Sequence, residues 1–155
     1  MTMASDGTKL TGLLFDGQRY YASHLRSVTT LDDTLTVFST TRRWLDIYFN
    51  DGIPDFTPDL MLPESDFRRV VTKIMMEVPY GATTTYGEIA RKVATRLGVK
   101  HMSAQAVGGA VGHNAISLII PCNRVLGANG QLTGYAGGLD KKKYMLQMEH
   151  KNIYN

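Results

Sequence analysis

Cysteine is nearly absent from this sequence: of its 155 residues, only Cys122 carries a thiol. One thiol excludes an internal disulfide and any zinc site that is built from several cysteines. It is compatible with a reducing compartment, or with a thiol that is itself reactive. The rest of the sequence must therefore decide whether Cys122 is a reagent or part of the core.

Long apolar segments are absent as well. The N-terminal sequence MTMASDGTKL has no apolar stretch like that of a signal peptide, and the run SLII is far too short to span a membrane. No internal repeat or low-complexity segment interrupts the chain. We expect a soluble protein of the cytoplasm, or of the nucleus in a eukaryote, without a membrane partner.

An excess of either charge is also lacking. The chain has 17 lysines and arginines against 14 acidic residues, a net charge of +3, and 43% hydrophobic residues. This mildly basic, globular composition permits contact with nucleic acid but does not require it. The length suffices for one domain, or for a small domain joined to a compact second one.

The first half of the sequence indicates mixed secondary structure. Asp16-Gly17 separates two strand-like runs within residues 9–30, which predicts a hairpin. Residues 30–52 predict a helix whose apolar stripe includes Trp44 and Tyr48 and which ends at Gly52. Three prolines within residues 53–65 then predict an extended linker, and we place a domain boundary at residue 63.

The second half predicts three helices, a buried run, a hairpin and a closing helix. The hairpin, over residues 125–135, has Asn129-Gly130 as its turn, and Ser65, Gly98 and Ser103 mark helix ends. This order is typical of a winged helix-turn-helix. We therefore expect an α+β protein, with a small mixed α/β domain and linker over residues 1–63 and a winged helix-turn-helix domain over residues 64–155.

Three features admit both a structural and a functional interpretation. Cys122 follows an apolar run, as a core cysteine does, yet Pro121 before it and Arg124 after it suit a positioned, activated thiol. The predicted helix over residues 102–114 is rich in glycine and alanine, so it either packs tightly or enters a nucleic-acid groove. Tyr86, at a helix start, is either packing or a proton donor.

With these motifs assembled, the sequence resembles the O6-alkylguanine-DNA alkyltransferases, also called methylated-DNA–protein-cysteine methyltransferases. The segments that carry the resemblance are VPYGATTTYGEIA, AVGGAVGHN, IIPCNRV and GYAGGLDKKKYMLQME, within residues 65–150. The resemblance implies that a thiolate irreversibly takes the alkyl group from O6 of guanine in double-stranded DNA, without a metal or an organic cofactor. It also implies that the target base leaves the stack through the minor groove. We expect the protein to act as a monomer.

The resemblance assigns a role to each matching residue. Cys122 corresponds to the alkyl acceptor, Asn114 to a hinge asparagine, and Glu149 to the carboxylate at the end of the hydrogen-bond chain that activates the thiol. Tyr86 corresponds to the tyrosine that turns the target phosphate and protonates guanine at N3. The base pocket would include Tyr135, Ala136, Gly137 and the carbonyls of Cys122 and Val125. The DNA-binding side would include Thr85, Gln105, Ala106, Gly108, Gly109 and Arg124, the last also corresponding to a structural arginine.

Two positions depart from the family pattern. Asn123 stands where the family has a histidine that acts as a base through a water, and an amide cannot accept a proton at physiological pH. Asn123 is therefore expected to take part only by hydrogen bonding, with slower alkyl transfer. Gln105 stands where the family has an arginine finger that fills the hole left by the flipped base, so weaker DNA binding or slower flipping is expected.

Other functions remain open at this point. One is a lesion sensor that binds O6-alkylguanine without alkyl transfer, which Asn123 and Gln105 favour and the retained Cys122 disfavours. Another is a winged-helix DNA-binding protein or a redox sensor centred on Cys122, which predicts reactivity toward oxidants but none toward alkylated DNA.

Overall fold

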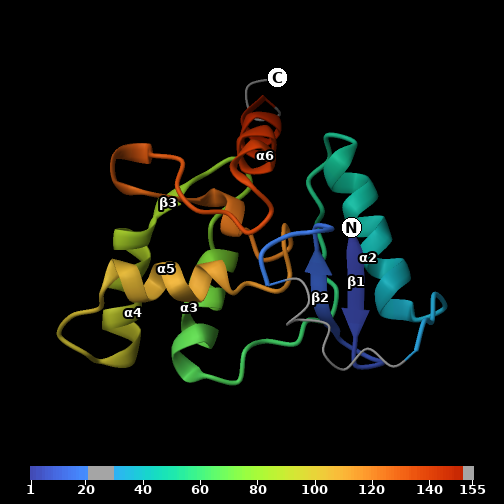
Figure 1. The fold of residues 1–155 in the computed structure, drawn as a ribbon, viewed down its shortest axis with the longest axis horizontal. Helices are drawn as coiled ribbons and strands as arrows, with labels where there is room; N and C mark the ends of the chain where they lie inside the picture. Colours follow the sequence, from blue (N-terminus) through green and yellow to red (C-terminus); the bar gives the residue numbers. More distant parts are fainter. Residues whose placement is uncertain (21–29, 152–155) are drawn as a thin grey trace.

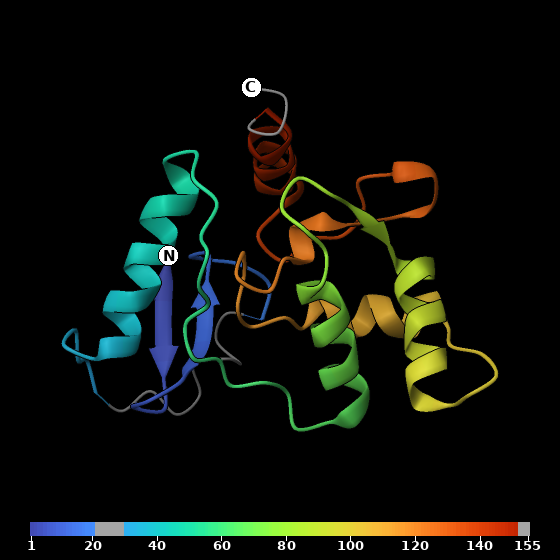
Figure 2. The same cartoon turned by 180° about the vertical axis from the view of Figure 1, so that it is seen from behind.

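Two groups of elements make up the fold, with helix α6 (Leu139–Lys151) between them (Figures 1 and 2). The computed structural model describes residues 1–20 and 30–151. Strands β1 (Thr2–Ser5) and β2 (Leu10–Leu14) and helix α2 (Thr36–Phe49) form one group, and helices α3, α4 and α5 form the other. This arrangement confirms the expected α+β class.

The hairpin at the N-terminus precedes the predicted one. Strand β2 pairs in antiparallel fashion with β1, which precedes it, and the turn between them lies at Asp6–Lys9. The Asp6 carboxylate accepts the backbone N–H groups of Thr8 and Lys9, at 2.9 and 2.7 Å, and so fixes this turn. Asp16-Gly17 does form a turn, but residues 18–20 after it are not a strand, and residues 21–29 lie outside the described part of the chain. Most of the second run of the hairpin predicted at Asp16-Gly17 lies outside the described residues, so that hairpin stays a prediction.

Helix α2 confirms the helix predicted within residues 30–52. Its buried residues, Val37, Thr41, Trp44 and Tyr48, recur every three or four positions, the spacing of one helix face. Tyr48 is fully buried and its ring stacks on that of Trp44, with centroids 5.2 Å apart. The helix thus presents the Tyr48 hydroxyl to the interior of the protein.

The three helices of the second group start and end close to the predicted positions. The Thr85 hydroxyl accepts the N–H of Glu88 at 3.1 Å in a capping box at the start of one helix, and Gly98 ends that same helix in the left-handed conformation, with φ 65°. The Ser103 hydroxyl accepts the N–H groups of Gln105 and Ala106. Ser65 occupies the predicted cap position, although its side chain makes no capping bond within the described residues. The helices are α3 (Asp66–Met76), α4 (Tyr86–Leu97) and α5 (Ala104–Gly112).

The wing after Cys122 is a loop rather than the expected hairpin. Asn129 and Gly130 both have positive φ and form the predicted turn, but the residues that follow make no strand. Strand β4 (Val125–Leu126) instead pairs in parallel with β3 (Thr84–Thr85). The buried Lys142 ammonium group donates to carbonyls on both arms of the loop, at Val125 and Thr133. The hairpin prediction for this segment is therefore wrong in its strands and right in its turn.

Strand β2 joins the two halves of the chain through backbone hydrogen bonds. Leu10 bonds to Asp59 and Met61 of the extended segment, and Leu13 bonds to Ala115 and Ser117, all at 2.8–2.9 Å. The buried core is continuous across both halves, from Leu10 and Tyr48 to Ile89 and Met145. The boundary at residue 63 stays a prediction. Among the described residues, no helix is long and apolar enough to span a membrane.

Candidate active site

Cys122 begins a short 3₁₀ turn, η1 (Cys122–Arg124), directly after the buried run of residues 116–121. Its side chain is only 5% exposed. Asn114, just after α5, places its amide Nδ2 3.1 Å from Cys122 Sγ and 3.0 Å from the Ile120 carbonyl, while its Oδ1 accepts the N–H of Ile116 at 3.1 Å. The asparagine that the sequence paired with Cys122 therefore ties the end of α5 to the turn that carries the thiol.

Burial raises the pKa of the Cys122 thiol, because an apolar environment disfavours the charged thiolate. The hydrogen bond from Asn114 and the charge of Lys142 act in the opposite direction without cancelling the effect of burial. The thiol in this closed state is consequently protonated at neutral pH, and it requires a proton acceptor before it can act as a nucleophile.

Lys142 is the cation whose charge lowers the pKa of the Cys122 thiol. The sequence analysis did not identify this residue. Its side chain is fully buried, and Nζ donates to the carbonyls of Val125, Thr133 and Gly134 at 2.5, 3.0 and 3.3 Å. Burial lowers its pKa, while a charge on Cys122 raises it. Among three consecutive lysines, only its helical spacing to the buried Met145 and Glu149 distinguishes it in the sequence.

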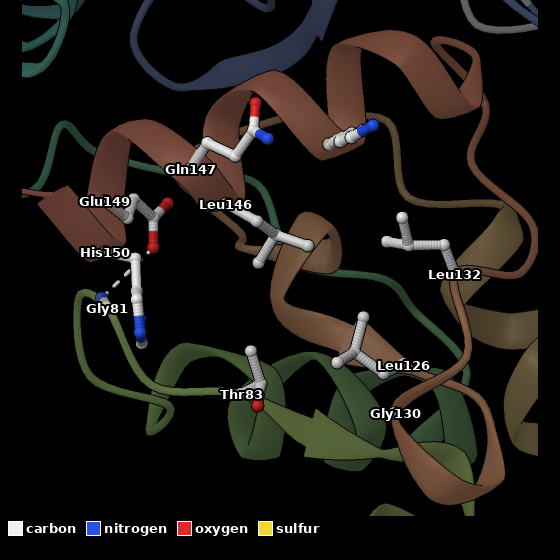
Figure 3. Close-up of a pocket in the computed structure, with 10 residues that line it drawn as sticks. Gly81, Thr83, Leu126, Gly130, Leu132, Leu146, Gln147, Glu149 and His150 are labelled. Atoms are coloured by element: carbon white, nitrogen blue, oxygen red, sulfur yellow. Dashed lines mark hydrogen bonds between the residues drawn. The ribbon is translucent and has the colours of Figure 1, made fainter.

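Glu149 is buried at the centre of a hydrogen-bond network. Its Oε1 accepts the Tyr48 hydroxyl at 2.6 Å and Asn123 Nδ2 at 2.9 Å. Its Oε2 accepts Arg124 Nε at 2.7 Å and the Gly81 N–H at 3.1 Å, the bond drawn in Figure 3. The structure thus brings together the predicted residues Glu149, Asn123 and Arg124, and adds Tyr48, which sequence reasoning assigned only to the core.

Arg124 corrects one sequence expectation. The side chain is buried; besides its ion pair with Glu149, it donates from a terminal nitrogen to the Val78 carbonyl at 2.8 Å. A guanidinium group held in this way cannot reach a DNA phosphate. The expectation of a DNA contact from Arg124 is therefore wrong, whereas a structural role agrees with these contacts.

The predicted pocket residues lie around the thiol and the wing. Tyr86 is half-buried, its hydroxyl donates to the Thr133 carbonyl at 3.3 Å, and burial raises its pKa. Burial also raises the pKa of Tyr135, with Cys122 as the next cause, so its hydroxyl lies close to the thiol. The Ala136 carbonyl accepts the Arg19 N–H at 3.1 Å. Gly137 lies so close to the ring of Phe15 that an added Cβ would be 2.7 Å from it.

The Val125 carbonyl already accepts Lys142, so its predicted contact with a base would use the second lone pair. Thr85 uses its hydroxyl in the cap of α4. On α5, Gln105, Ala106 and Gly109 are exposed, and Gly108 is half-buried beside Tyr86. Space for an added Cβ is open at Gly109 and Gly112. One surface of α5 therefore consists of small residues, with Gln105 on the first turn.

A cavity of about 540 Å³ lies between the loop before β3, the wing and α6 (Figure 3). Leu126, Leu132 and Leu146 make it largely apolar, and Glu149 lies at its edge. Cys122 does not line it, so this cavity is not the pocket of the thiol. Within residues 1–20 and 30–151, no cluster of three or more His, Cys, Asp or Glu side chains could hold a metal ion.

The buried pair of Glu149 and Arg124 predicts a large stability loss on substitution. We expect Glu149→Gln to lower the free energy of unfolding by about 3–5 kcal/mol, because Arg124 would remain buried without its counter-charge. Urea unfolding measures this. Glu77→Gln is the matched control: Glu77 pairs with Arg96 at 2.7 Å but is half exposed, so its loss should stay below about 1 kcal/mol. Equal losses in the two variants would contradict the prediction.

Comparisons with known proteins identify the family. Residues 66–151 match the family model described as 6-O-methylguanine DNA methyltransferase, DNA binding domain. Methylated-DNA–protein-cysteine methyltransferase of Mycobacterium tuberculosis is 40% identical to this chain, over 96% of this chain and 85% of the relative. The Haemophilus influenzae protein of the same name is 36% identical, over 96% of this chain and 79% of the relative. The crystal structure of Mycobacterium tuberculosis OGT in complex with DNA matches with a TM-score of 0.82 and 38% identity, over 97% of this chain and 86% of that one. The chain therefore belongs to the 6-O-methylguanine-DNA methyltransferase family.

Proposed function

We propose that this protein repairs DNA by transferring the alkyl group of O6-alkylguanine to Cys122. The observation that carries the proposal is the contact of Asn114 Nδ2 with Cys122 Sγ at 3.1 Å, next to the Glu149 network. This contact fixes the one thiol of the chain directly behind α5. A core cysteine would need neither this amide donor nor buried charged groups around it.

The reaction is a displacement at the alkyl carbon. The Cys122 thiolate attacks that carbon, the S–C bond forms as the C–O6 bond breaks, and guanine leaves with the bonding electrons. Tyr86 is proposed to donate a proton toward guanine N3, which makes guanine a better leaving group. The thioether cannot be hydrolysed under these conditions, so each molecule acts once. The displacement uses no metal and no organic cofactor, because thiolate and alkylguanine are the only reactants.

Recognition of DNA is proposed to use α5. Its exposed Ala106 and Gly109 and the open space at Gly109 would let the backbone approach a minor groove closely. Gln105 would enter the duplex where the base has left it, and Thr85 would contact the backbone. Tyr135, Ala136, Gly137 and the carbonyls of Cys122 and Val125 would then form the pocket for the flipped base.

We also propose that the protein works as a monomer in a reducing compartment, the cytoplasm or a nucleus. A free thiol that must stay reduced until it meets its substrate supports this compartment. Sedimentation in the presence and absence of DNA reports the oligomeric state.

Intact-mass spectrometry tests the proposed function most directly. The protein is incubated with a duplex that carries one O6-methylguanine, and Cys122→Ser serves as the control. We expect the wild-type protein to gain one methyl group and the control to gain none. Binding of the duplex without a mass gain would instead indicate a lesion sensor that does not transfer the alkyl group.

Asn123 should limit the rate of transfer. We expect Asn123→His to speed single-turnover demethylation by roughly tenfold or more, because general-base help is typically worth about 10²–10⁴-fold. Asn123→Gln is the control for a longer side chain without a base. Quenched time courses with the methylated duplex measure the rates. A histidine variant that is no faster than wild type would contradict this prediction.

Gln105 should limit the affinity for DNA. We expect Gln105→Arg to bind duplex more tightly at fixed salt and to steepen the dependence of log K on log salt by about one, the effect of one added positive charge at the DNA. Gln147→Arg adds the same charge on α6, beside the cavity of Figure 3, and should change both quantities less. Fluorescence anisotropy at several salt concentrations measures both. Equal gains in the two variants would mean that net charge alone is responsible.

A further inference from the structure

Two buried oxygen atoms near Cys122 lack a hydrogen-bond partner among the described residues. They are Asn123 Oδ1 and the hydroxyl of Tyr135. Asn123 is completely buried, and its Nδ2 is already engaged with Glu149 Oε1. Buried polar atoms are normally bonded to protein or to an ordered water. An ordered water bonded to these two oxygens would satisfy both of them.

Tyr48 and Asn123 are both hydrogen-bonded to Glu149. The Tyr48 hydroxyl donates to the same Oε1 atom that Asn123 Nδ2 contacts, so Tyr48 and Asn123 lie side by side on one carboxylate oxygen. Burial is the main cause that raises the pKa of Tyr135, and electrostatic interactions with Cys122 and then Tyr48 add to it. Burial is the main cause that raises the pKa of Tyr48, so its hydroxyl stays protonated and acts as a donor.

An amide cannot move a proton as an imidazole can, but a hydroxyl can, because it accepts one proton while it donates its own. We propose that Tyr48, contributed by the N-terminal half, is the positioning residue through which the proton of the Cys122 thiol reaches Glu149. This inference rests on the proposed function and adds the step that Asn123 cannot perform.

The proton balance of the step is complete. The thiol proton passes to the water held by Asn123 Oδ1 and the Tyr135 hydroxyl, and that water passes a proton to the Tyr48 oxygen. Tyr48 at the same time gives its own proton to Glu149 Oε1. The products are a Cys122 thiolate, a neutral Glu149 and an unchanged Tyr48. The sulfur then supplies the electron pair for the S–C bond.

Other titratable groups face this path and remain in place during the step. Arg124 and Tyr80 lie beside Tyr48, with the Arg124 guanidinium on the second oxygen of Glu149. At the other end of the path, Lys142 and Tyr86 interact electrostatically with Cys122. The Lys142 charge favours the thiolate.

The test compares single-turnover transfer by wild type, Tyr48→Phe, Asn123→His and the double variant, from about pH 6 to about pH 9. We expect Tyr48→Phe to slow transfer about tenfold or more near neutral pH, and its rate to rise with pH in proportion to the thiolate fraction. In the Asn123→His background, the same change should cost less than about twofold, because the imidazole provides another path. Tyr144→Phe, an exposed tyrosine on α6, is the control and should match wild type.

Several results would overturn the inference. A Tyr48→Phe variant with the wild-type rate and pH profile would show that Tyr48 has no role. A loss that is equal at every pH and in both backgrounds would show a purely structural role. If Tyr48→Phe fails to fold, Tyr135→Phe removes the other hydroxyl of the path. The transfer rate of that variant must then show the same rise with pH.

A failure of the proposed function can be told apart from a failure of this inference. If wild-type protein gains no methyl group from the duplex, the proposed function fails. The pH dependence of Cys122 alkylation by iodoacetamide in the same variants still tests the path, because that reaction also requires the thiolate. Identical profiles for wild type and Tyr48→Phe in that reaction would overturn the inference by itself.

Discussion

The buried carboxylate of Glu149 is the interaction on which the site depends. Its four donors come from α2, from the loop before β3 and from two residues of η1, so one side chain of α6 holds three other parts of the chain in place. A carboxylate buried here without partners would strongly destabilise the folded protein. Each donor that is removed leaves the negative charge of Glu149 with one hydrogen bond fewer. The position of the thiol is therefore set by electrostatics as much as by packing.

The same burial keeps the thiol unreactive until it is needed. The resting thiol is protonated, closed to solvent and held by Asn114, which protects it from oxidants that attack thiolates. Lys142 supplies a fixed positive charge that favours the thiolate once a proton acceptor is in reach. A protein that uses its nucleophile only once benefits from this arrangement, because a premature reaction cannot be reversed by turnover.

The sequence predicted what depends on local pattern and missed what depends on contacts between distant segments. The helix ends at Gly98 and Ser103 follow from capping chemistry, and Asn114 and Glu149 follow from the resemblance to the family motifs. Tyr48 lies 101 positions from its partner Glu149, so the sequence marked it only as a core residue, and Lys142 differs from its two neighbouring lysines only in its helical spacing to Met145 and Glu149. The hairpin over residues 125–135 was mispredicted because turn residues specify a reversal of the chain but not the strand that will pair with it.

The bonds of Leu13 to Ala115 and Ser117 have a consequence for how the protein forms during synthesis. About a hundred residues separate β2 from these partners, and translation proceeds at about 5–20 residues per second, so β2 leaves the ribosome roughly 5–20 s before they do. During that interval, this edge of the strand has no partner and is open to pairing with other nascent chains. The short length of β2 and the glycine within it limit that hazard on the ribosome.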